Sequence, residues 1–181
     1  DVAGKTVRIV NALNQASTIE YDLAGHRRAL DDSALGVWSY KYNGFSELVE
    51  QVDPRGEQIN LKYDQIGRLI ERKTRSGVAE YYYDEVKGEP GNASRFVGQL
   101  LRVVSPDSTQ RDLRYDEFGR VKSLKFGVGL YSSMATIAYD NYSRPVSRTY
   151  SSGVTLANLY DAQGFWWKVQ VSKEGDKESQ V

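Results

Sequence analysis

The sequence has no cysteine and a single histidine, His26, among its 181 residues. Without cysteine the chain can form neither a disulfide nor a thiolate metal site, and the redox compartment is left open. One histidine gives little basis for a histidine-based zinc site or a catalytic dyad. These two shortages argue against several metal-dependent and nucleophilic enzyme classes.

Net charge and long apolar runs are missing as well. The chain has 24 basic and 24 acidic residues, so it lacks the basic surface typical of nucleic-acid-binding proteins. No stretch approaches the roughly 18 apolar residues of a membrane-spanning helix, and no signal peptide is visible at the start. Because the sequence begins and ends within a repeating pattern, we expect it to be part of a longer protein.

Tyrosine is the abundant aromatic residue, with 13 copies against five phenylalanines and three tryptophans. Tyrosine favours β-strands, and its apolar ring with a polar end suits a surface that is half solvated. The mean hydropathy is −0.57, which is polar for a chain rich in strand-forming residues. We therefore expect strands with one solvated face and no helix.

A short phrase returns along the chain about every 21 residues, and its marker is an Asp or Asn that follows a tyrosine. The markers are Asp1, Asp22, Asn43, Asp64, Asp84, Asp116, Asp140 and Asp161. Asp1 has no residue before it, and the successive steps are 21, 21, 21, 20, 32, 24 and 21 residues. A fixed period of this length indicates a repeat architecture.

The two irregular steps predict insertions. After Asp84 the glycine of the phrase comes at Gly98 instead of position 87, which indicates an 11-residue insertion near residues 85–97. Its Gly, Pro, Asn and Ser content is typical of a surface loop. The 24-residue step holds a smaller insertion, which we place in the stretch FGVGLYSS near the opposite turn.

Within the phrase, Asp at position i and Gly at i+3 are typical of a type I turn. The Asp side chain can accept backbone N–H groups two residues on, and the glycine can adopt the left-handed conformation of a bulged hairpin. Tips of this kind are predicted at Asp1–Gly4, Asp22–Gly25, Asp64–Gly67, Asp116–Gly119 and Asp161–Gly164, with degenerate copies at Asn43–Ser46 and Asp140–Ser143. A second set of turns is predicted at Asp53–Gly56, Ser76–Gly77, Ser105–Ser108 and Ser152–Gly153.

Each period then consists of two strands of roughly 6 to 8 residues. The fold class predicted is all-β: an extended antiparallel meander of around 14 to 16 strands that forms a curved strip, with tyrosines stacked in ladders across the strands. Residues 1–172 would hold about seven to eight repeats, and residues 173–181 would be a polar end. Each repeat would be stabilised by pairing with its neighbours.

The phrase resembles the YD repeats of RHS proteins. That family includes the shell-forming subunits of bacterial insecticidal toxin complexes, polymorphic bacterial toxins, wall-associated repeat proteins and the teneurins. Residues 63–69 match the pattern in full, and residues 115–121 match with Val121 in the place of leucine. The copies at residues 21–26 and 160–165 match with His26 and Phe165 in the place of arginine, whereas Tyr42, Tyr83 and Tyr139 keep the tyrosine and lose other parts.

The resemblance implies a β-strip that belongs to a hollow shell, and in the toxin members such a shell encloses a cytotoxic C-terminal segment. We therefore expect a structural, non-catalytic segment of a secreted bacterial toxin, without a cofactor. Its expected partners are the remaining RHS shell and the enclosed toxin segment, with other toxin-complex subunits or glycans as further candidates, and with neither nucleic acid nor a membrane span. Some members cleave themselves, but their signature is absent here, so this activity is not carried over.

The residues expected to matter are those of the structural repeat, with no catalytic, cofactor or metal residue among them. They are Tyr21, Asp22, Gly25, Tyr42, Tyr63, Asp64, Gly67, Arg68, Tyr83, Asp84, Tyr115, Asp116, Gly119, Arg120, Tyr139, Asp140, Tyr160, Asp161 and Gly164. His26 occupies the arginine position of other copies, and we interpret it as a variable repeat position.

Two other functions are weighed against the shell. A hydrolase would need a nucleophile, a base and oxyanion donors that converge, which one histidine and serines in turns do not supply. Acidic tips such as Asp31–Asp32 lack the oxygen-ligand spacing of a calcium loop. The alternative function is a carbohydrate- or cell-surface-binding module, in which rows of tyrosine and tryptophan, with Trp166–Trp167 among them, stack on sugars.

Overall fold

The computed structural model describes residues 3–85 and 97–175, and these residues form fifteen β-strands without a helix. No segment of this described part could therefore cross a membrane as a helix. The strands are β1 (Arg8–Val10), β2 (Ala16–Tyr21), β3 (Arg27–Asp32), β4 (Gly36–Tyr42), β5 (Leu48–Val52), β6 (Gln58–Tyr63), β7 (Leu69–Thr74), β8 (Gly77–Tyr83), β9 (Leu100–Val104), β10 (Gln110–Tyr115), β11 (Val121–Val128), β12 (Tyr131–Tyr139), β13 (Pro145–Tyr150), β14 (Val154–Tyr160) and β15 (Trp166–Lys173).

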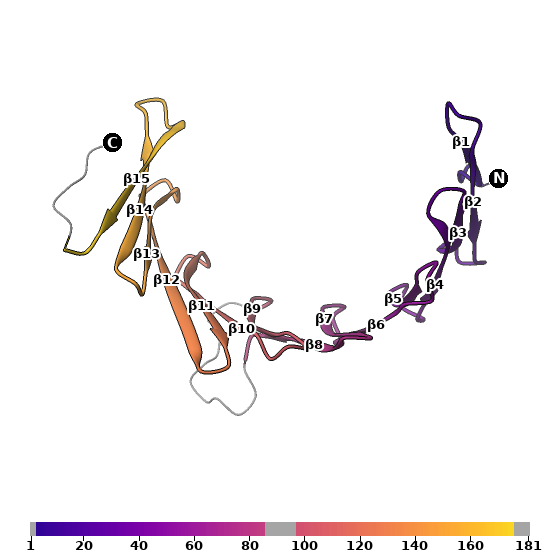
Figure 1. The fold of residues 1–181 in the computed structure, drawn as a ribbon, viewed down its shortest axis with the longest axis horizontal. Coiled ribbons are helices and arrows are strands. Elements are labelled where there is room, and N and C mark those ends of the chain that lie inside the picture. The colour runs from indigo at the N-terminus through magenta and orange to yellow at the C-terminus, as the bar shows by residue number, and fades with distance from the viewer. Residues whose placement is uncertain (1–2, 86–96, 176–181) are drawn as a thin grey trace. The chain divides into compact units, whose positions relative to one another are not determined.

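The hydrogen-bonded order of the strands follows the sequence from β1 to β15 (Figure 1). Neighbouring strands pair antiparallel, as in β6 with β7 and β11 with β12. The prediction of an all-β antiparallel meander is thus confirmed, and fifteen strands fall within the expected number. By its contacts the chain divides into two units, Asp1–Glu80 and Tyr81–Val181, which are described separately below.

In the first unit the pairing places tyrosines and aliphatic residues on one face of the sheet. Trp38 lies opposite Leu30, Tyr63 opposite Leu69, and Tyr40 on the same face in β4. The other face is charged. Lys62 pairs with Glu71 across β6 and β7 at 2.9 Å, and an equivalent lysine–glutamate pair joins β4 and β5. Apolar and charged residues alternate along each strand, and because successive side chains of a strand point to opposite faces, the two kinds lie on opposite faces of the sheet.

The second unit repeats this division. Leu113, Leu124 and Ala135 lie side by side on β10, β11 and β12, on the face that also carries the tyrosines at the strand ends. Asp112, Lys125 and Met134 lie on the opposite face of the same three strands. We call these the tyrosine face and the polar face.

Few residues are buried in either unit, because a single sheet has no second layer to cover it. Among the described residues, the buried ones are Tyr40, Ala79, Leu101, Thr109, Asp112 and Ala135. Even Leu101, the most enclosed, is a strand residue on the tyrosine face and not part of a central core. Stability must therefore come mainly from contacts between neighbouring strands.

The hairpins whose first strand ends in the tyrosine before a tip share one irregularity in their strand pairing. In six of them the pairing shifts by one residue just before the tyrosine, as between Lys62 and Tyr63 or between Ala138 and Tyr139. The extra residue is a β-bulge, which increases the local twist and bends the strand. The 11-residue insertion predicted near residues 85–97 lies almost wholly outside the described residues, as does the tip residue Asp1.

Candidate functional site

The repeated hairpin tips are the most regular feature of the structure, and Asp64 illustrates their geometry. Its backbone N–H donates to the carbonyl of Arg68 at 2.9 Å, and the N–H of Gly67 donates to the Asp64 carbonyl at 3.1 Å. The side-chain Oδ1 of Asp64 accepts the N–H groups of Ile66 and Arg68 at 3.0 and 2.9 Å. The Nε of Arg68 donates to Oδ2 at 2.7 Å. One carboxylate thus holds the whole turn.

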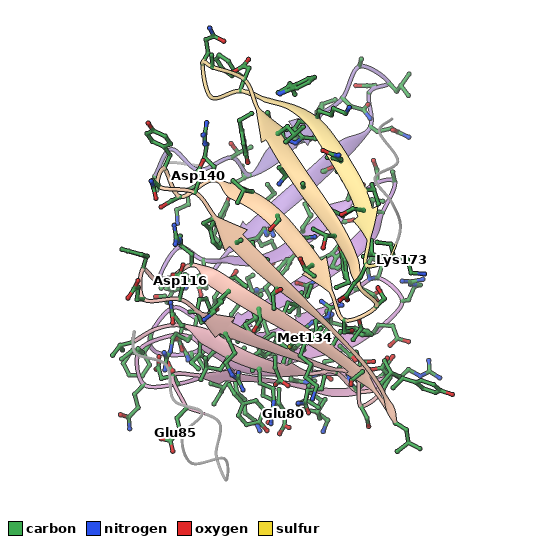
Figure 2. All side chains as sticks on the ribbon, turned by 90° about the vertical axis from the view of Figure 1, so that its left-hand side faces the viewer. Glu80, Glu85, Asp116, Met134, Asp140 and Lys173 are labelled. Atoms are coloured by element: carbon green, nitrogen blue, oxygen red, sulfur yellow. The ribbon has the colours of Figure 1, made fainter. Side chains whose placement is uncertain are left out.

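The same pattern returns at the other tips with different partners four residues on. Arg120 and Arg144 donate to Asp116 and Asp140 at 2.7 Å. His26 Nδ1 lies 3.1 Å from Asp22 Oδ2. In Figure 2, Asp116 and Asp140 lie at one edge of the sheet, whereas Lys173 lies at the opposite edge.

Two tips, at Asn43 and Asp161, keep the same turn without an ion pair between an aspartate and a cation. At Asn43 the roles are reversed, because its amide Nδ2 donates to the carboxylate of Glu47 at 2.7 Å. At Asp161 the carboxylate accepts the backbone N–H groups of Gln163 and Phe165 at 3.0 and 2.8 Å, and Phe165 stands where other copies have arginine. The backbone geometry is kept while the side-chain chemistry varies.

Hydrogen bonding lowers the pKa of the carboxyl groups of Asp22, Asp64, Asp116 and Asp140. For Asp64 the main cause is the backbone N–H of Arg68, which favours the charged form. For Asp116 and Asp140, partial desolvation raises the pKa, but the hydrogen bonds from Arg120 and Arg144 outweigh it and the net shift is downward. These four tips are therefore held by ionised carboxylates at neutral pH.

At five tips the tyrosine before the tip contacts the preceding repeat through its hydroxyl group. This group donates to the backbone carbonyl of the residue that follows the preceding tip, which lies five positions after the marker of that repeat, or sixteen positions after Asp84 where the insertion intervenes. The bonds are Tyr21–Thr6 at 3.0 Å, Tyr63–Leu48 at 2.9 Å, Tyr115–Leu100 at 2.8 Å, Tyr139–Val121 at 2.9 Å and Tyr160–Pro145 at 3.0 Å. Burial raises the pKa of both Tyr63 and Tyr115, with Glu47 adding to the shift at Tyr63.

The ring of the same tyrosine contacts the cationic position of the preceding repeat. The Arg120 guanidinium lies 4.4 Å from the centre of the Tyr139 ring, and Arg144 lies at the same distance from Tyr160. His26 stacks on Tyr42 with ring centres 4.6 Å apart. The stacking of tyrosine on tyrosine stays a prediction, and at these positions the ring contact is made with a cation or an imidazole of the preceding repeat. Such a contact contributes about 0.5–1 kcal/mol at an exposed site.

Two arginines are enclosed on both sides by aromatic rings. Phe118, two residues before Arg120, lies 4.8 Å from its guanidinium, and Tyr142 lies 5.1 Å from that of Arg144. Each of these arginines therefore joins its own tip carboxylate, its own tip ring and the tyrosine of the next repeat. The tip ring itself remains exposed, with 70% of Phe118 accessible to solvent.

The structure brings the predicted repeat residues together in this network wherever it describes their contacts. Gly25, Gly67, Gly119 and Gly164 occupy the left-handed region at the tips. Asp84 accepts the N–H of Gly98 and donates its own N–H to the Gln99 carbonyl, so the tip is closed by residues that follow the insertion.

The roles of two members of the network, His26 and Glu47, were not predicted from the sequence. His26 was interpreted as a variable position, yet it bonds to Asp22 and stacks on Tyr42. Glu47 was not singled out because its pairing reverses the usual charges. Both residues lie four positions after their marker, as the tip arginines do, and each can form a hydrogen bond with the marker side chain. This spacing is the signal that could have indicated their roles. Among the described residues no group of three or more potential metal ligands occurs.

Comparison with solved structures links this fold to the Tc toxins. The chain superimposes on part of a chain in the crystal structure of TcdB2-TccC3-Cdc42 with a TM-score of 0.66 and 17% identity, over 91% of this chain and 9% of the other. For TcdB2-TccC3-TEV the values are 0.66, 13%, 98% and 12%. For the Photorhabdus luminescens Tc holotoxin pore they are 0.55, 12%, 90% and 10%. The chain shares its fold with these Tc toxin chains.

A curated relative is also a toxin. The double-stranded DNA deaminase toxin A of Burkholderia cenocepacia (strain H111) is 29% identical over 121 residues, which cover 67% of this chain and 8% of that protein. No protein-family model matches the chain. The similarities in fold and in sequence both lead to toxin proteins. The chain spans about a tenth of the length of the proteins it matches.

Proposed function

We propose that this chain is a structural, non-catalytic segment of an RHS/YD-repeat shell, which encloses and protects the cargo of a secreted bacterial toxin. The observation that carries the proposal is the bonding between repeats. Five of the links use a tyrosine hydroxyl on the preceding repeat, as in Tyr139 to Val121, and several add a cation over the same ring. The repeats therefore form a wall that extends by adding identical units.

The composition of the wall supports a role as a barrier. Its strands pair through their backbones without a gap in the hydrogen-bonded order. A protease needs an extended, accessible segment of backbone, and paired strands do not offer one. A cargo behind such a wall would be shielded from proteases while the wall itself resists cleavage.

The chemistry of the curated relative does not transfer to this chain. Zinc-dependent deaminases hold their metal with a histidine and two cysteines, or with three cysteines. This sequence has no cysteine and one histidine, and that histidine is bonded to Asp22 in a repeat tip. The matched 8% of the relative therefore corresponds, in this proposal, to a part of the toxin that carries no deaminase centre.

The test uses the natural protein that contains this chain. We expect that protein, purified intact and treated with protease, to retain a protected fragment that includes both the repeats and an enclosed segment, and electron microscopy to show a hollow particle. Opening the wall with denaturant should expose the enclosed segment to digestion. A particle without a cavity, or a cargo digested at the same rate with and without denaturant, would overturn the proposal.

A further inference from the structure

Asn43 and Gly44 are the only Asn-Gly pair in the sequence, and they lie in the hairpin tip between β4 and β5 of the first unit (Figure 1). Gly44 is not among the glycines with positive φ, and a Cβ added to it would meet no atom within 4 Å. Other tips have a side chain at this position, namely Leu23, Gln65 and Glu117. The turn would therefore accept a side chain at position 44, and what Gly44 adds is an unshielded backbone nitrogen.

The side chain of Asn43 is folded back toward that nitrogen. Its Oδ1 accepts the backbone N–H of Phe45 at 2.9 Å, which closes a turn through the side chain. The loop closed by this bond contains Cγ, Cβ, Cα and C of Asn43 together with the nitrogen of Gly44. These atoms are the members of a succinimide ring. The turn therefore restricts the two groups that would react to close this ring, which favours an intramolecular reaction between them.

The amide oxygen of Asn43 accepts two backbone donors. Besides the N–H of Phe45, the N–H of Glu47 donates to Oδ1 at 3.1 Å. The Glu47 carboxylate accepts a hydrogen bond from Nδ2 at 2.7 Å, so the amide keeps its oxygen toward the donors. Paired N–H groups on an acyl oxygen stabilise the negative charge that develops there when a nucleophile adds to the carbon. The tip thus supplies to Asn43 what an oxyanion hole supplies in acyl transfer.

The nitrogen of Gly44 is open to solvent. Gly44 is exposed, and among the described residues none accepts a hydrogen bond from its N–H. Solvent hydroxide can therefore remove this proton, which an attack by the nitrogen requires. Because Gly44 has no side chain, nothing on it hinders the approach of the nitrogen to Cγ of Asn43.

We propose that Asn43 is a site of spontaneous deamidation in the folded chain. Hydroxide takes the proton of the Gly44 N–H, and the nitrogen forms a bond to Cγ of Asn43. The bond between Cγ and Nδ2 then breaks, and Nδ2 takes a proton from water and leaves as ammonia. Water opens the resulting succinimide at either carbonyl. Cleavage between Cγ and the nitrogen gives aspartate, and cleavage between the backbone carbon and the nitrogen gives isoaspartate.

Either product weakens this tip. An aspartate in the place of Asn43 would set its carboxylate against that of Glu47, where Nδ2 now donates at 2.7 Å, and like charges at this distance repel each other. An isoaspartate would route the main chain through the side-chain carbons and lengthen the turn, which the Asn43 N–H closes on the Glu47 carbonyl at 3.0 Å. At Asp64 the matching position holds Arg68, so a carboxylate is stabilised there. Deamidation would thus loosen the pairing of β4 with β5 as the protein ages. This inference goes beyond the shell function and does not rest on it.

The test incubates the full chain at neutral pH and follows Asn43 by mass spectrometry of its peptides, with isoaspartate separated from aspartate by chromatography. We expect Asn43 to convert before any other asparagine of the chain. We also expect conversion to be faster in the folded chain than in the same chain unfolded in urea, because the tip holds the reacting groups. Conversion that occurs only in urea, or that is slower in the folded chain, would overturn the proposal.

Gly44→Gln is the matched variant, since Gln65 follows Asp64 in a tip with the same hydrogen bonds. It should slow the conversion of Asn43 by about tenfold or more. Its Tm should stay the same or rise, because an unstrained replacement of glycine reduces the conformational entropy of the unfolded chain. Conversion at the wild-type rate in this variant would overturn the role of the Gly44 nitrogen.

Asn43→Asp reproduces one product and tests its effect on the tip. Its Tm at neutral pH should lie below that of the wild type, because two carboxylates then face each other. Adding Glu47→Gln should recover most of the loss, since the glutamine amide can donate to the new carboxylate. An unchanged Tm in Asn43→Asp, or a loss that Glu47→Gln does not reduce, would overturn the predicted weakening of the tip.

Discussion

Each hairpin tip depends on one residue in the left-handed backbone region. Where the sequence has glycine, as at Gly67 with φ +82°, this conformation costs little. In the two degenerate tips Ser46 and Ser143 adopt φ values of 67° and 62°, so the tip imposes its conformation even on a residue that resists it. The left-handed conformation is required because the paired strands on either side are longer than the turn and fix the positions of its two ends.

Replacing Gly67 with valine should destabilise the chain by about 1 kcal/mol or more, since a β-branched residue is strained in the left-handed region. The new Cβ would also lie 3.0 Å from the Glu47 carboxylate, which would have to move. Urea denaturation of the wild type and the variant measures the change in the free energy of unfolding. Unchanged stability in Gly67→Val would contradict the role assigned to this tip.

The opposite substitution provides the matched control. Ser46→Gly removes the left-handed strain of a non-glycine residue, which costs about 1–2 kcal/mol, and adds the chain entropy of glycine, about 0.5–1 kcal/mol. We expect a net gain of roughly 0.5 kcal/mol in the same measurement. If both substitutions destabilise equally, the effect is not one of backbone conformation.

At the scale of the strands, the contacts between repeats follow from their register. Tyr139 reaches the Val121 carbonyl because β11 and β12 are paired neighbours, and it lies where the pairing of β12 with β13 shifts by one residue. The hydroxyl thereby satisfies a carbonyl next to the bulge, where the regular ladder is interrupted. This arrangement explains why tyrosine, and not phenylalanine, precedes the tips.

Tyr139→Phe tests this role, because it removes the hydroxyl group and keeps the ring over Arg120. We expect a loss of about 0.5–1.5 kcal/mol in the free energy of unfolding and faster amide exchange around Val121. The control is Tyr131→Phe, which removes a hydroxyl group from a side chain that is 85% exposed and should change neither quantity. Equal effects of the two substitutions would rule out a specific role for the Tyr139 hydroxyl.

The elements could be predicted from the sequence because their signals are local. The alternation of apolar and polar residues predicts which side chains share a face of the sheet, and the Asp-x-x-Gly spacing predicts the positions of the hairpin tips. The partners of the tyrosines could not be predicted in the same way. A ring such as Tyr160 contacts Arg144 and the Pro145 carbonyl, sixteen and fifteen residues earlier, and only the paired register with its bulge brings them together.

At the scale of the whole molecule, stability is spread along the chain instead of being concentrated in a core. Among the described residues only a few side chains are buried, and they are scattered over several strands. Each repeat adds its own tip, its own tyrosine bond and the pairing with its neighbour, so the total grows with the number of repeats. A condition that weakens every tip together should therefore affect the whole chain more than any single substitution does.

Acid is such a condition. The pKa values of Asp22, Asp64, Asp116 and Asp140 are all lowered by the hydrogen bonds of their tips. A carboxyl group with a lowered pKa in the folded state stabilises the fold above the unfolded pKa of about 3.9, and this contribution is lost as the pH falls through the lower, folded value. Stability should thus be nearly constant from neutral pH to about pH 5 and fall steeply below about pH 4.

Thermal unfolding at a series of pH values measures this profile, and Asp64→Asn shows which groups cause it. Asparagine can still accept the backbone N–H groups of the turn, as Asn43 does in its own tip, but it cannot titrate. The variant should therefore have a lower Tm than the wild type at neutral pH, where the ion pair with Arg68 is lost, and the two curves should converge in acid. Curves that stay parallel down to pH 3 would show that other carboxylates, and not the tips, govern the acid transition.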